Sequence, residues 1–375
     1  MESSKRRRTG NGGGRKGSGR EFDMARYSQR HVALRVVYFG QGMHGFAAQE
    51  GIEHTVEGHL FRALLKTRLI VDRDSSEYAR CGRTDKDVSA LGNVISLRLR
   101  SHLREGVGFA EPDEGSAAAS AEAGGGAARE ELDYPRMLNA VLPPEVRVSG
   151  WCAVPVDFSA RFSCRERQYR YFFDSSGLDV GRLREACRHL EGEHDFRNFC
   201  KMDVENVKSF TRTVLSFVVC EPPIPDGLHY FQIRGTAFLW HQVRCMVAIL
   251  FMVGAGQEEP SLLPILLDLK ATPKKPQYNM APAAPLVLAA TVFDGVSFAL
   301  SAAQCTQLQT HLRERWAAEM TAAAMSQHAI DSLSGLASGA AKKPKHVPIQ
   351  RRAIEPTFEE RLAKTRAKAK EKETR

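Results

Sequence analysis

The chain has 375 residues, of which 43% are hydrophobic and 26% charged, a balance typical of a soluble protein with two domains or two lobes. Its 53 Lys and Arg residues outnumber its 44 Asp and Glu residues, and the formal charge of +9 suits a polyanionic partner without identifying one. The longest apolar stretch, Cys245 to Gly256, is too short to span a bilayer, and the eight cysteines include no close CxxC pair. We therefore expect no membrane protein and no zinc-ribbon or redox motif, and we expect reduced thiols inside the cell.

Residues 1–30 begin the chain with the basic cluster Lys5 to Arg8 and a glycine-rich run, and we expect a disordered basic arm. A short basic cluster can act as a nuclear-import signal or can simply keep a flexible tail in solution. Both the nucleus and the cytoplasm are therefore open as the compartment.

Residues 31–155 are predicted to form a first lobe. Alternating apolar and polar side chains predict strands, and an apolar row at helical spacing behind Thr55 predicts a capped helix. Residues 101–131 are rich in Gly, Ala, Ser and Glu, so we expect a flexible insert without a core of its own. The expected elements are a strand from His31 to Gly40, a helix from Val56 to Val71, a strand from Asn93 to Arg100, a short helix from about Pro135 and a strand from Val146 to Val154.

Residues 156–325 are predicted to form a second lobe, followed by a low-complexity linker and a charged tail at 326–375. The tail is expected to be helical in part and solvated overall. The expected elements are a strand from Gln168 to Asp174, a helix from Val180 to Gly192, strands at Thr211 to Cys220 and His229 to Arg234, a helix from Val243 to Gly254, a strand from Leu286 to Phe293 and a helix after Gln304.

The order of these elements favours an α+β fold with a mixed or antiparallel sheet over a doubly wound parallel sheet, because several predicted strands are adjacent along the chain. No glycine-rich dinucleotide loop opens the fold.

The stretch from Cys81 to Ala90, which we call the signature loop, carries crowded charges immediately before a predicted strand. A carboxylate at Asp85 between Arg83 and Lys86 would have its ionised form stabilised, as nucleophilic attack or electrostatic support of a cationic intermediate requires. The same residues are also standard in turns, where Thr84 and Asp85 would only bond the backbone. The loop alone leaves both readings open.

The signature loop resembles that of the TruA family of tRNA pseudouridine synthases, commonly G-R-T-D-x-G-V-x-A. The resemblance extends from about His31 to Asp294 through further segments in the family's order. These segments are Gly45 to Gln49, Phe158 to Ser163, Arg167 to Tyr171 and Phe238 to Arg244. Ordered agreement of this kind favours the catalytic reading of Asp85.

The resemblance implies a role for several residues of this chain. Asp85 matches the essential aspartate and Arg83 its neighbour in the active-site loop. Tyr169 matches the tyrosine that stacks on the target base, and Arg244 matches an arginine that pairs with the aspartate. For Arg244, the alternative is a surface arginine lying along a core helix.

Three further residues keep two readings each. Arg161 and Lys86 are expected to face RNA phosphates, although loop cations are often simply solvated. His241 could join the pocket or could be a structural histidine.

The fold implied by the resemblance is the two-lobed pseudouridine synthase fold with a basic cleft. The implied activity is isomerisation of uridine to pseudouridine in tRNA, without a metal or another cofactor. The segments His194 to Asp203 and Gln277 to Leu288 are most similar to the eukaryotic branch acting at tRNA positions 38 and 39, in the anticodon stem-loop. Bacterial relatives imply a homodimer.

One position departs from the family pattern: Asp87 stands where the family has glycine. Glycine there can serve a positive φ or a close approach to RNA, and a second carboxylate near Asp85 could weaken catalysis. The alternative function is therefore a catalytically impaired tRNA-binding protein or RNA chaperone of the same fold.

Overall fold

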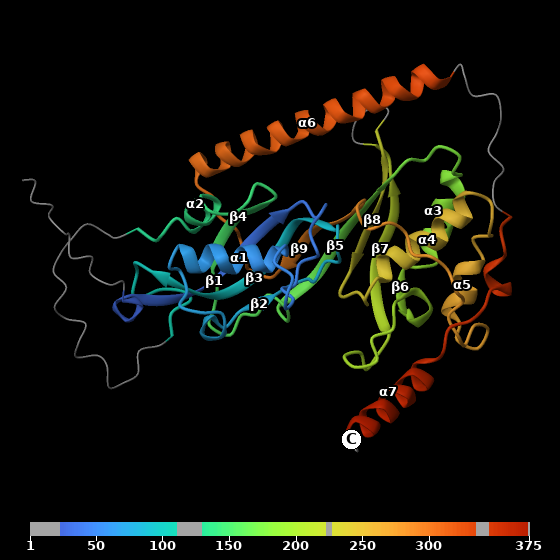
Figure 1. Ribbon diagram of the computed structural model, residues 1–375, viewed down its shortest axis with the longest axis horizontal. Coiled ribbons are helices and arrows are strands. Elements are labelled where there is room, and N and C mark those ends of the chain that lie inside the picture. Colours follow the sequence, from blue (N-terminus) through green and yellow to red (C-terminus); the bar gives the residue numbers. More distant parts are fainter. Residues whose placement is uncertain (1–22, 111–129, 223–226, 335–344, 374–375) are drawn as a thin grey trace, which may run out of the picture.

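The computed structural model describes residues 23–110, 130–222, 227–334 and 345–373. They form one mixed sheet of nine strands with helices packed against it, so the predicted α+β class is confirmed (Figure 1). The predicted disordered arm and flexible insert fall mostly on residues 1–22 and 111–129, which lie outside the described residues. The two ends of the insert are described, and they are joined by a hydrogen bond from Ser101 Oγ to Glu131 at 2.6 Å. Glu131 also accepts a hydrogen bond from Arg30 Nη1 of β1 at 3.0 Å.

The chain builds one half of the sheet before the other. Up to residue 153 the elements are β1 (Ser28–Tyr38), α1 (Val56–Lys66), β2 (Ala79–Arg80), β3 (Ser89–Ser101), α2 (Tyr134–Asn139) and β4 (Val146–Ala153). From residue 164 they are β5 (Cys164–Phe173), α3 (Val180–Arg188), β6 (Gly192–Asp195), β7 (Thr211–Cys220), β8 (His229–Gly235), α4 (Gln242–Gly254), α5 (Leu262–Leu267), β9 (Leu286–Phe293), α6 (Ala302–Ser334) and α7 (Phe358–Glu373).

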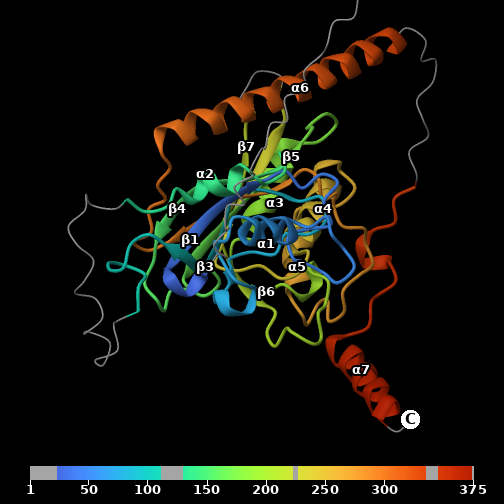
Figure 2. The same ribbon diagram turned by 60° about the vertical axis from the view of Figure 1, so that its left-hand side comes forward.

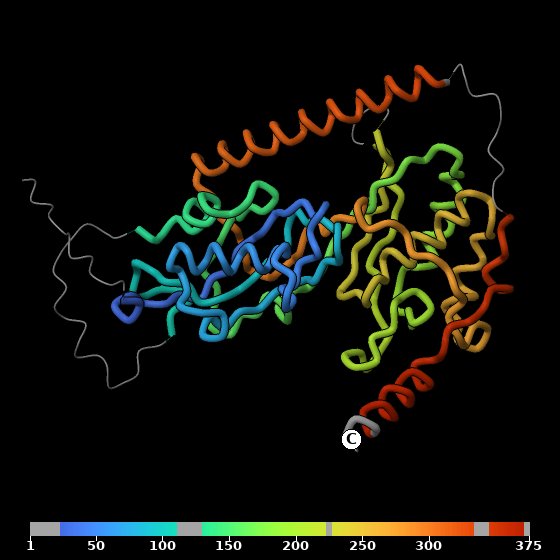
Figure 3. Tube along the Cα trace, in the orientation of Figure 1, coloured from blue at the N-terminus to red at the C-terminus, as the bar shows by residue number. Residues whose placement is uncertain are grey.

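Strand β9 joins the two halves of the sheet. The strand order is β4-β1-β3-β9-β5-β8-β7-β6, with β2 paired to β3. The chain returns late in the sequence to place β9 at the middle, as the tube view shows (Figure 3). It runs parallel to β3, with Ala90 opposite Leu288, and antiparallel to β5, with Tyr169 opposite Leu288. The strand that follows the signature loop and the strand that carries Tyr169 therefore both neighbour β9.

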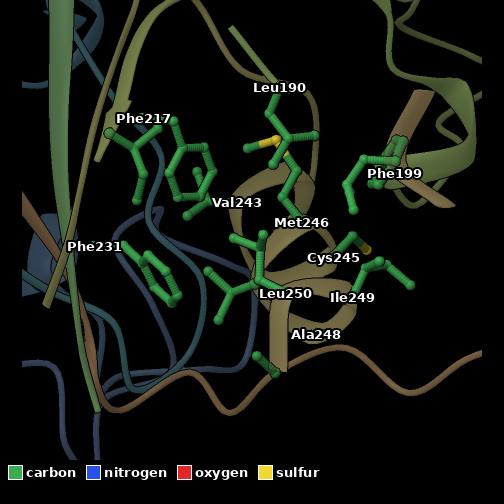
Figure 4. Close-up of a cluster of buried hydrophobic side chains, with 14 of the residues drawn as sticks. Leu190, Phe199, Phe217, Phe231, Val243, Cys245, Met246, Ala248, Ile249 and Leu250 are labelled. Carbon is green, nitrogen blue, oxygen red and sulfur yellow. The ribbon is translucent and has the colours of Figure 1, made fainter. Parts of the chain in front are cut away.

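The hydrophobic core is divided into two large clusters, one on each half of the sheet. In the second half, α4 lies against β7 and β8, and its side chains Val243, Met246 and Leu250 meet Phe217 and Phe231 (Figure 4). Burial of this apolar stripe holds the N-terminal end of α4 in place. Arg244, on the same first turn, lies at the edge of the stripe, as predicted.

Helix α1 ends at Lys66, so the predicted helix from Val56 to Val71 was too long. The hydroxyl of Thr67 donates to the carbonyl oxygens of Ala63 and Leu64, and Arg68 adopts a left-handed backbone with φ of 53°. These features close the last turn and redirect the chain. The N-terminal cap was predicted correctly, because Thr55 Oγ1 accepts a hydrogen bond from Gly58 N at 3.2 Å.

The end of the chain also differs from expectation. Residues 345–357 were expected to be solvated, yet Ile349 is fully buried in the second cluster of the core. Its backbone N–H donates to Glu258 Oε1 at 2.7 Å, and Lys275 pairs with Glu355 at 3.3 Å. Helix α7 follows this docked segment and extends away from the sheet, while α6 runs along one side of the molecule (Figure 2). None of the described helices is long and apolar enough to cross a membrane.

Candidate active site

The signature loop leaves the sheet between β2 and β3 and is fastened at its base by Asn93. This fully buried amide accepts a hydrogen bond from Gly82 N at 3.2 Å and donates to Gly82 O at 3.1 Å. Its amide nitrogen also donates to the hydroxyl of Tyr38 at 3.2 Å. Buried polar groups that satisfy one another in this way rigidify the segment that carries them.

Thr84 fixes the loop one residue before Asp85. Its buried hydroxyl lies 2.8 Å from the Tyr38 hydroxyl, and its carbonyl oxygen accepts a hydrogen bond from Phe46 N at 3.1 Å. Burial raises the pKa of Tyr38, so this phenol stays neutral and can share a proton with Thr84. The turn reading and the functional reading of Thr84 and Asp85 are thus compatible, because Thr84 bonds the frame while the Asp85 side chain is 23% exposed.

Two glycines let the segment after β1 approach the loop. A Cβ on Gly40 would lie 2.2 Å from the carbonyl oxygen of Val88. A Cβ on Gly45, whose φ is +92°, would lie 3.0 Å from the carbonyl oxygen of Thr84 and 3.2 Å from the carbonyl carbon of Asp85. Contact this close requires glycine at both positions. It gives a physical reason for the glycine that begins the Gly45 to Gln49 segment.

The carboxylate of Asp85 meets two side chains from the start of α4. Arg244 Nη1 lies 3.6 Å and His241 Nε2 lies 3.3 Å from Asp85 Oδ2. Arg244 is held from its other side, because its Nε donates to the carbonyl oxygen of Ala281 at 2.8 Å. The Arg244 side chain is 14% exposed, so its permanent positive charge is largely shielded from solvent where it meets the carboxylate.

Tyr169 lies on β5 at the contact between the two core clusters and packs partly against both. Its ring meets Phe238 edge-on, with centroids 5.2 Å apart. Burial raises the pKa of Tyr169, and the nearby negative charge of Asp85 adds to this rise. The structure therefore brings together Asp85, Tyr169 and Arg244, with Tyr169 as a neutral aromatic ring.

The remaining predicted residues lie at the rim of the site. Arg83, Arg161 and Lys86 are exposed. Partial burial of its guanidinium, followed by the positive charges of Arg80 and Arg161, lowers the pKa of Arg83. Arg83 and Arg161 thus form a local concentration of positive charge, although they belong to segments far apart in the sequence.

Asp87 has a left-handed backbone with φ of 65°, the geometry for which glycine is favoured. Its carboxylate oxygen Oδ1 accepts a hydrogen bond from Gly42 N at 3.0 Å, so it ties the signature loop to the segment after β1. The backbone N–H of Asp87 also donates to the carbonyl oxygen of Met43, in that same segment, at 3.2 Å. Asp87 therefore serves as a link within the frame, a contact that the sequence pattern did not suggest.

Two residues of the site were not assigned from the sequence. His241 was left between two readings, and the structure places it against Asp85. Arg167 was quoted only as part of a segment, yet its Nη2 donates to the carbonyl oxygens of Arg161 at 3.1 Å and Cys81 at 3.3 Å. The alternation along β5, which puts Arg167 on the same face as Tyr169, was the signal that could have identified it.

This arrangement offers a carboxylate paired with a cation, a neutral aromatic ring beside it and positive charges at the rim. It is suited to an anionic substrate with a flat ring, on which the carboxylate can act as a nucleophile or as an electrostatic support. Because hydrogen bonds at Gly82, Thr84 and Asp87 hold the loop, the carboxylate is oriented before any substrate arrives.

Comparison with known proteins gives consistent matches. A family model described as tRNA pseudouridine synthase matches residues 186–294, which contain Arg244 but not Asp85. The "tRNA pseudouridine(38/39) synthase" of Homo sapiens is 46% identical over 311 residues, covering 80% of this chain and 63% of the human protein. The Bos taurus protein of the same name is 43% identical over 339 residues, covering 87% of this chain and 68% of that protein.

A more distant relative is covered more fully. The "Probable tRNA pseudouridine synthase tag-124" of Caenorhabditis elegans is 34% identical over 348 residues, covering 89% of this chain and 86% of that protein. The chain spans 63% of the length of the human relative, so about a third of that relative has no counterpart in the alignment.

Proposed function

The chain belongs to the tRNA pseudouridine synthase family, and we propose that it isomerises uridine to pseudouridine in tRNA with Asp85 as the catalytic carboxylate. The observation that carries this proposal is the contact of Asp85 with Arg244 and His241 in a loop whose frame is hydrogen-bonded and buried.

The proposed chemistry balances within the substrate. The N1–C1′ bond of uridine breaks, the C5–C1′ bond forms, one proton leaves C5 and one is added at N1. The base must leave its stack to turn, which costs a few kcal/mol. Stacking on Tyr169 and phosphate contacts from Arg83, Arg161 and Lys86 would offset this cost. Asp85 supplies the covalent or electrostatic step, and Arg244 orients its carboxylate.

The proposed target is the anticodon stem-loop, with uridines 38 and 39 as the modified positions, because relatives with this name are 43% and 46% identical to the chain. The proposed binding surface lies between two lobes, residues 31–155 and 156–325, where the two core clusters adjoin at Tyr169. The chain has 53 basic residues against 44 acidic residues, and this positive excess supports a polyanionic substrate.

The test is pseudouridine formation in an unmodified tRNA with uridines at positions 38 and 39, comparing wild type with Asp85→Asn. We expect product from the wild type at one or both positions, no product from the variant, and equal tRNA binding by both. Binding by wild type without product, across several tRNAs, would contradict the enzyme and favour the binding protein or chaperone.

The alternative depends on Asp87 impairing the chemistry, and Asp87→Gly tests it. The carboxylate of Asp87 bonds Gly42 N, so we expect the glycine variant to keep the wild-type rate within a few-fold and to lose about 1 kcal/mol of stability or less, because glycine relieves the positive φ. A rate that rises by an order of magnitude or more in Asp87→Gly would support the impaired-protein alternative instead.

A further inference from the structure

Phe162 is the most exposed of the large hydrophobic side chains in the described part of the chain, at 80%. Its loop is nevertheless held firmly. Ser163 N donates to Ser159 O at 2.8 Å, and Ser159 N donates to Ser163 Oγ at 3.1 Å, which closes a tight turn. Ala160 N donates to Ser96 Oγ on β3 at 3.1 Å, in the buried interior. The ring of Phe162 thus projects into solvent from a rigid base, so its exposure is not the result of a loose loop.

This turn is fastened to the signature loop. Arg167 Nη2 donates both to Arg161 O and to Cys81 O, at 3.1 Å and 3.3 Å. Its Nη1 donates to Thr236 O, at 2.6 Å. A single guanidinium therefore ties the backbone before Phe162 to the start of the loop that carries Asp85.

Trp240 is the second exposed aromatic residue near Asp85, at 43%. It directly precedes His241, whose Nε2 lies 3.3 Å from Asp85 Oδ2, and the two rings have centroids 4.9 Å apart. Its backbone is also held, because Lys201 N donates to Trp240 O at 2.9 Å.

A cationic side chain lies beside each of the two rings. The Arg161 guanidinium carbon lies 5.2 Å from the centroid of Phe162, and Lys201 Nζ lies 4.1 Å from the centroid of Trp240. An exposed aromatic ring alone is common on protein surfaces. Here two rigidly held rings each have a cation beside them, and both lie on segments that contact the signature loop or His241. This pairing of ring and cation matches a partner that has both flat rings and negative charges. Unpaired RNA has both, whereas a paired stem hides the faces of its bases.

We propose that Phe162 and Trp240 are two stacking platforms for unpaired bases that flank the target uridine in the substrate RNA. This inference rests on the proposed function and adds to it. The platforms hold unpaired loop nucleotides next to the base that Asp85 acts on, and Arg161 and Lys201 neutralise the adjoining phosphates. Tyr169 stacks on the target base, and these platforms stack on its neighbours.

The test compares aromatic and aliphatic replacements in the full chain. Phe162→Leu and Trp240→Leu keep an apolar side chain but remove the π face, while Phe162→Tyr and Trp240→Phe keep the π face. We expect each leucine variant to raise the Kd for an unmodified tRNA transcript about 5- to 150-fold, the range of one base–aromatic stack, and the aromatic variants to bind within a few-fold of wild type. The slope of log K against log salt concentration should stay unchanged in the leucine variants, because no ionic contact is removed.

Two controls keep the outcomes separate. A fully paired RNA duplex should bind the leucine variants and the wild type equally, because it exposes no base faces. Melting temperatures should match, because both rings are exposed in the folded protein. Leucine variants that bind tRNA as tightly as wild type, or that lose affinity for the duplex to the same extent, would overturn the platforms. Failure of the wild type to form pseudouridine while the leucine variants still bind more weakly would overturn the proposed activity and leave the platforms standing.

Discussion

His241 is distinguished by its backbone as well as by its contact with Asp85. Its φ of 61° is left-handed, which is strained for a residue with a Cβ, and it is the N-cap of α4 without a capping hydrogen bond from its side chain. Its ring nitrogen Nδ1 is buried and has no hydrogen-bond partner among the described residues. The strained backbone holds the imidazole against the carboxylate, and this contact distinguishes His241 from an ordinary N-cap residue.

Replacing His241 separates its backbone role from its side-chain role. His241→Gly tolerates the positive φ but removes the imidazole, and we expect kcat to fall about 100-fold with tRNA affinity unchanged, because Asp85 loses an orienting partner. His241→Ala should show the same fall in kcat and in addition a loss of about 1 kcal/mol in stability, from the left-handed backbone. Single-turnover kinetics and thermal unfolding measure the two effects. A glycine variant with the wild-type rate would reduce His241 to a helix cap.

At the scale of elements, α1 supports the signature loop through a buried carboxylate. Glu57 is fully buried, accepts a hydrogen bond from Ala48 N at 2.8 Å and pairs with Arg80 of β2 and with Arg73 at 3.2 Å. Burial alone would raise the pKa of Glu57, but the hydrogen bond from Ala48 N and the pairing with Arg80 outweigh it and lower the pKa below its usual value near 4.5. The segment from Gly45 to Gln49 and the strand before the signature loop thus share one anchor.

The sign of this shift predicts a dependence of stability on pH. Because the pKa of Glu57 is lower in the folded chain, its contribution is fully present above about pH 4.5 and is lost as the pH falls below that value. Glu57→Gln should lower the free energy of unfolding at pH 7 by about 1 to 3 kcal/mol and should flatten the loss of stability in acid. Urea unfolding at pH 7 and at pH 4 measures both. Equal acid sensitivity of the variant and wild type would contradict the assignment.

Helix α6 exposes large hydrophobic side chains, among them Trp316 and Met320. Residues 316–333 are exposed throughout, although in proteins most of the stability of a helix comes from packing one of its faces against a partner. Trp316, Met320, Ala323 and Gln327 follow each other at heptad spacing, and residues 316–334 contain two acidic residues but no Lys or Arg. This composition disfavours RNA and fits the surface of a second copy of the chain, which we propose as the route to a homodimer.

The homodimer proposal is tested on opposite faces of α6. Met320→Glu places a charge in the row formed by Trp316, Met320, Ala323 and Gln327 and should shift the protein from dimer to monomer at micromolar concentration, as light scattering measures. Ala318→Glu, about half a turn away, should leave the dimer intact. A wild type that is already monomeric, or a Met320→Glu variant that stays dimeric, would exclude α6 as the interface.

At the scale of the whole molecule, β9 makes the two halves of the sheet one structure. Leu288 of this strand is fully buried in the first core cluster and lies opposite both Ala90 of β3 and Tyr169 of β5. The active-site strands therefore share their support, and loosening one half should loosen the other.

We expect a single cooperative unfolding transition, seen at the same denaturant concentration by single-tryptophan variants that keep Trp151 in one half or Trp240 in the other. Leu288→Ala should shift both transitions together, lowering the free energy of unfolding by about 2 to 5 kcal/mol. Val292→Ala, at a 38% exposed position on the same strand, is the matched control and should cost less than about 1 kcal/mol. Separate transitions for the two reporters would show that the halves unfold independently.

The sequence by itself determined the local elements and the chemistry of the signature loop. Strands β7 and β9 have the predicted bounds, since their apolar residues and turn signals lie within the strand itself. Short elements such as β6 and α5 were not predicted, because a few residues carry too little periodicity to register. Asp85, Tyr169 and Arg244 were identified from motifs, and the structure brings them together without testing the roles that the motifs imply.

Only the tertiary structure decided how distant segments meet. The placement of β9 between β3 and β5, the burial of Ile349, the link from Asp87 to Gly42 and the contact of His241 with Asp85 all join residues far apart in the chain. Such contacts depend on which surfaces are left to pack after the local elements form, and no spacing within one segment encodes that choice.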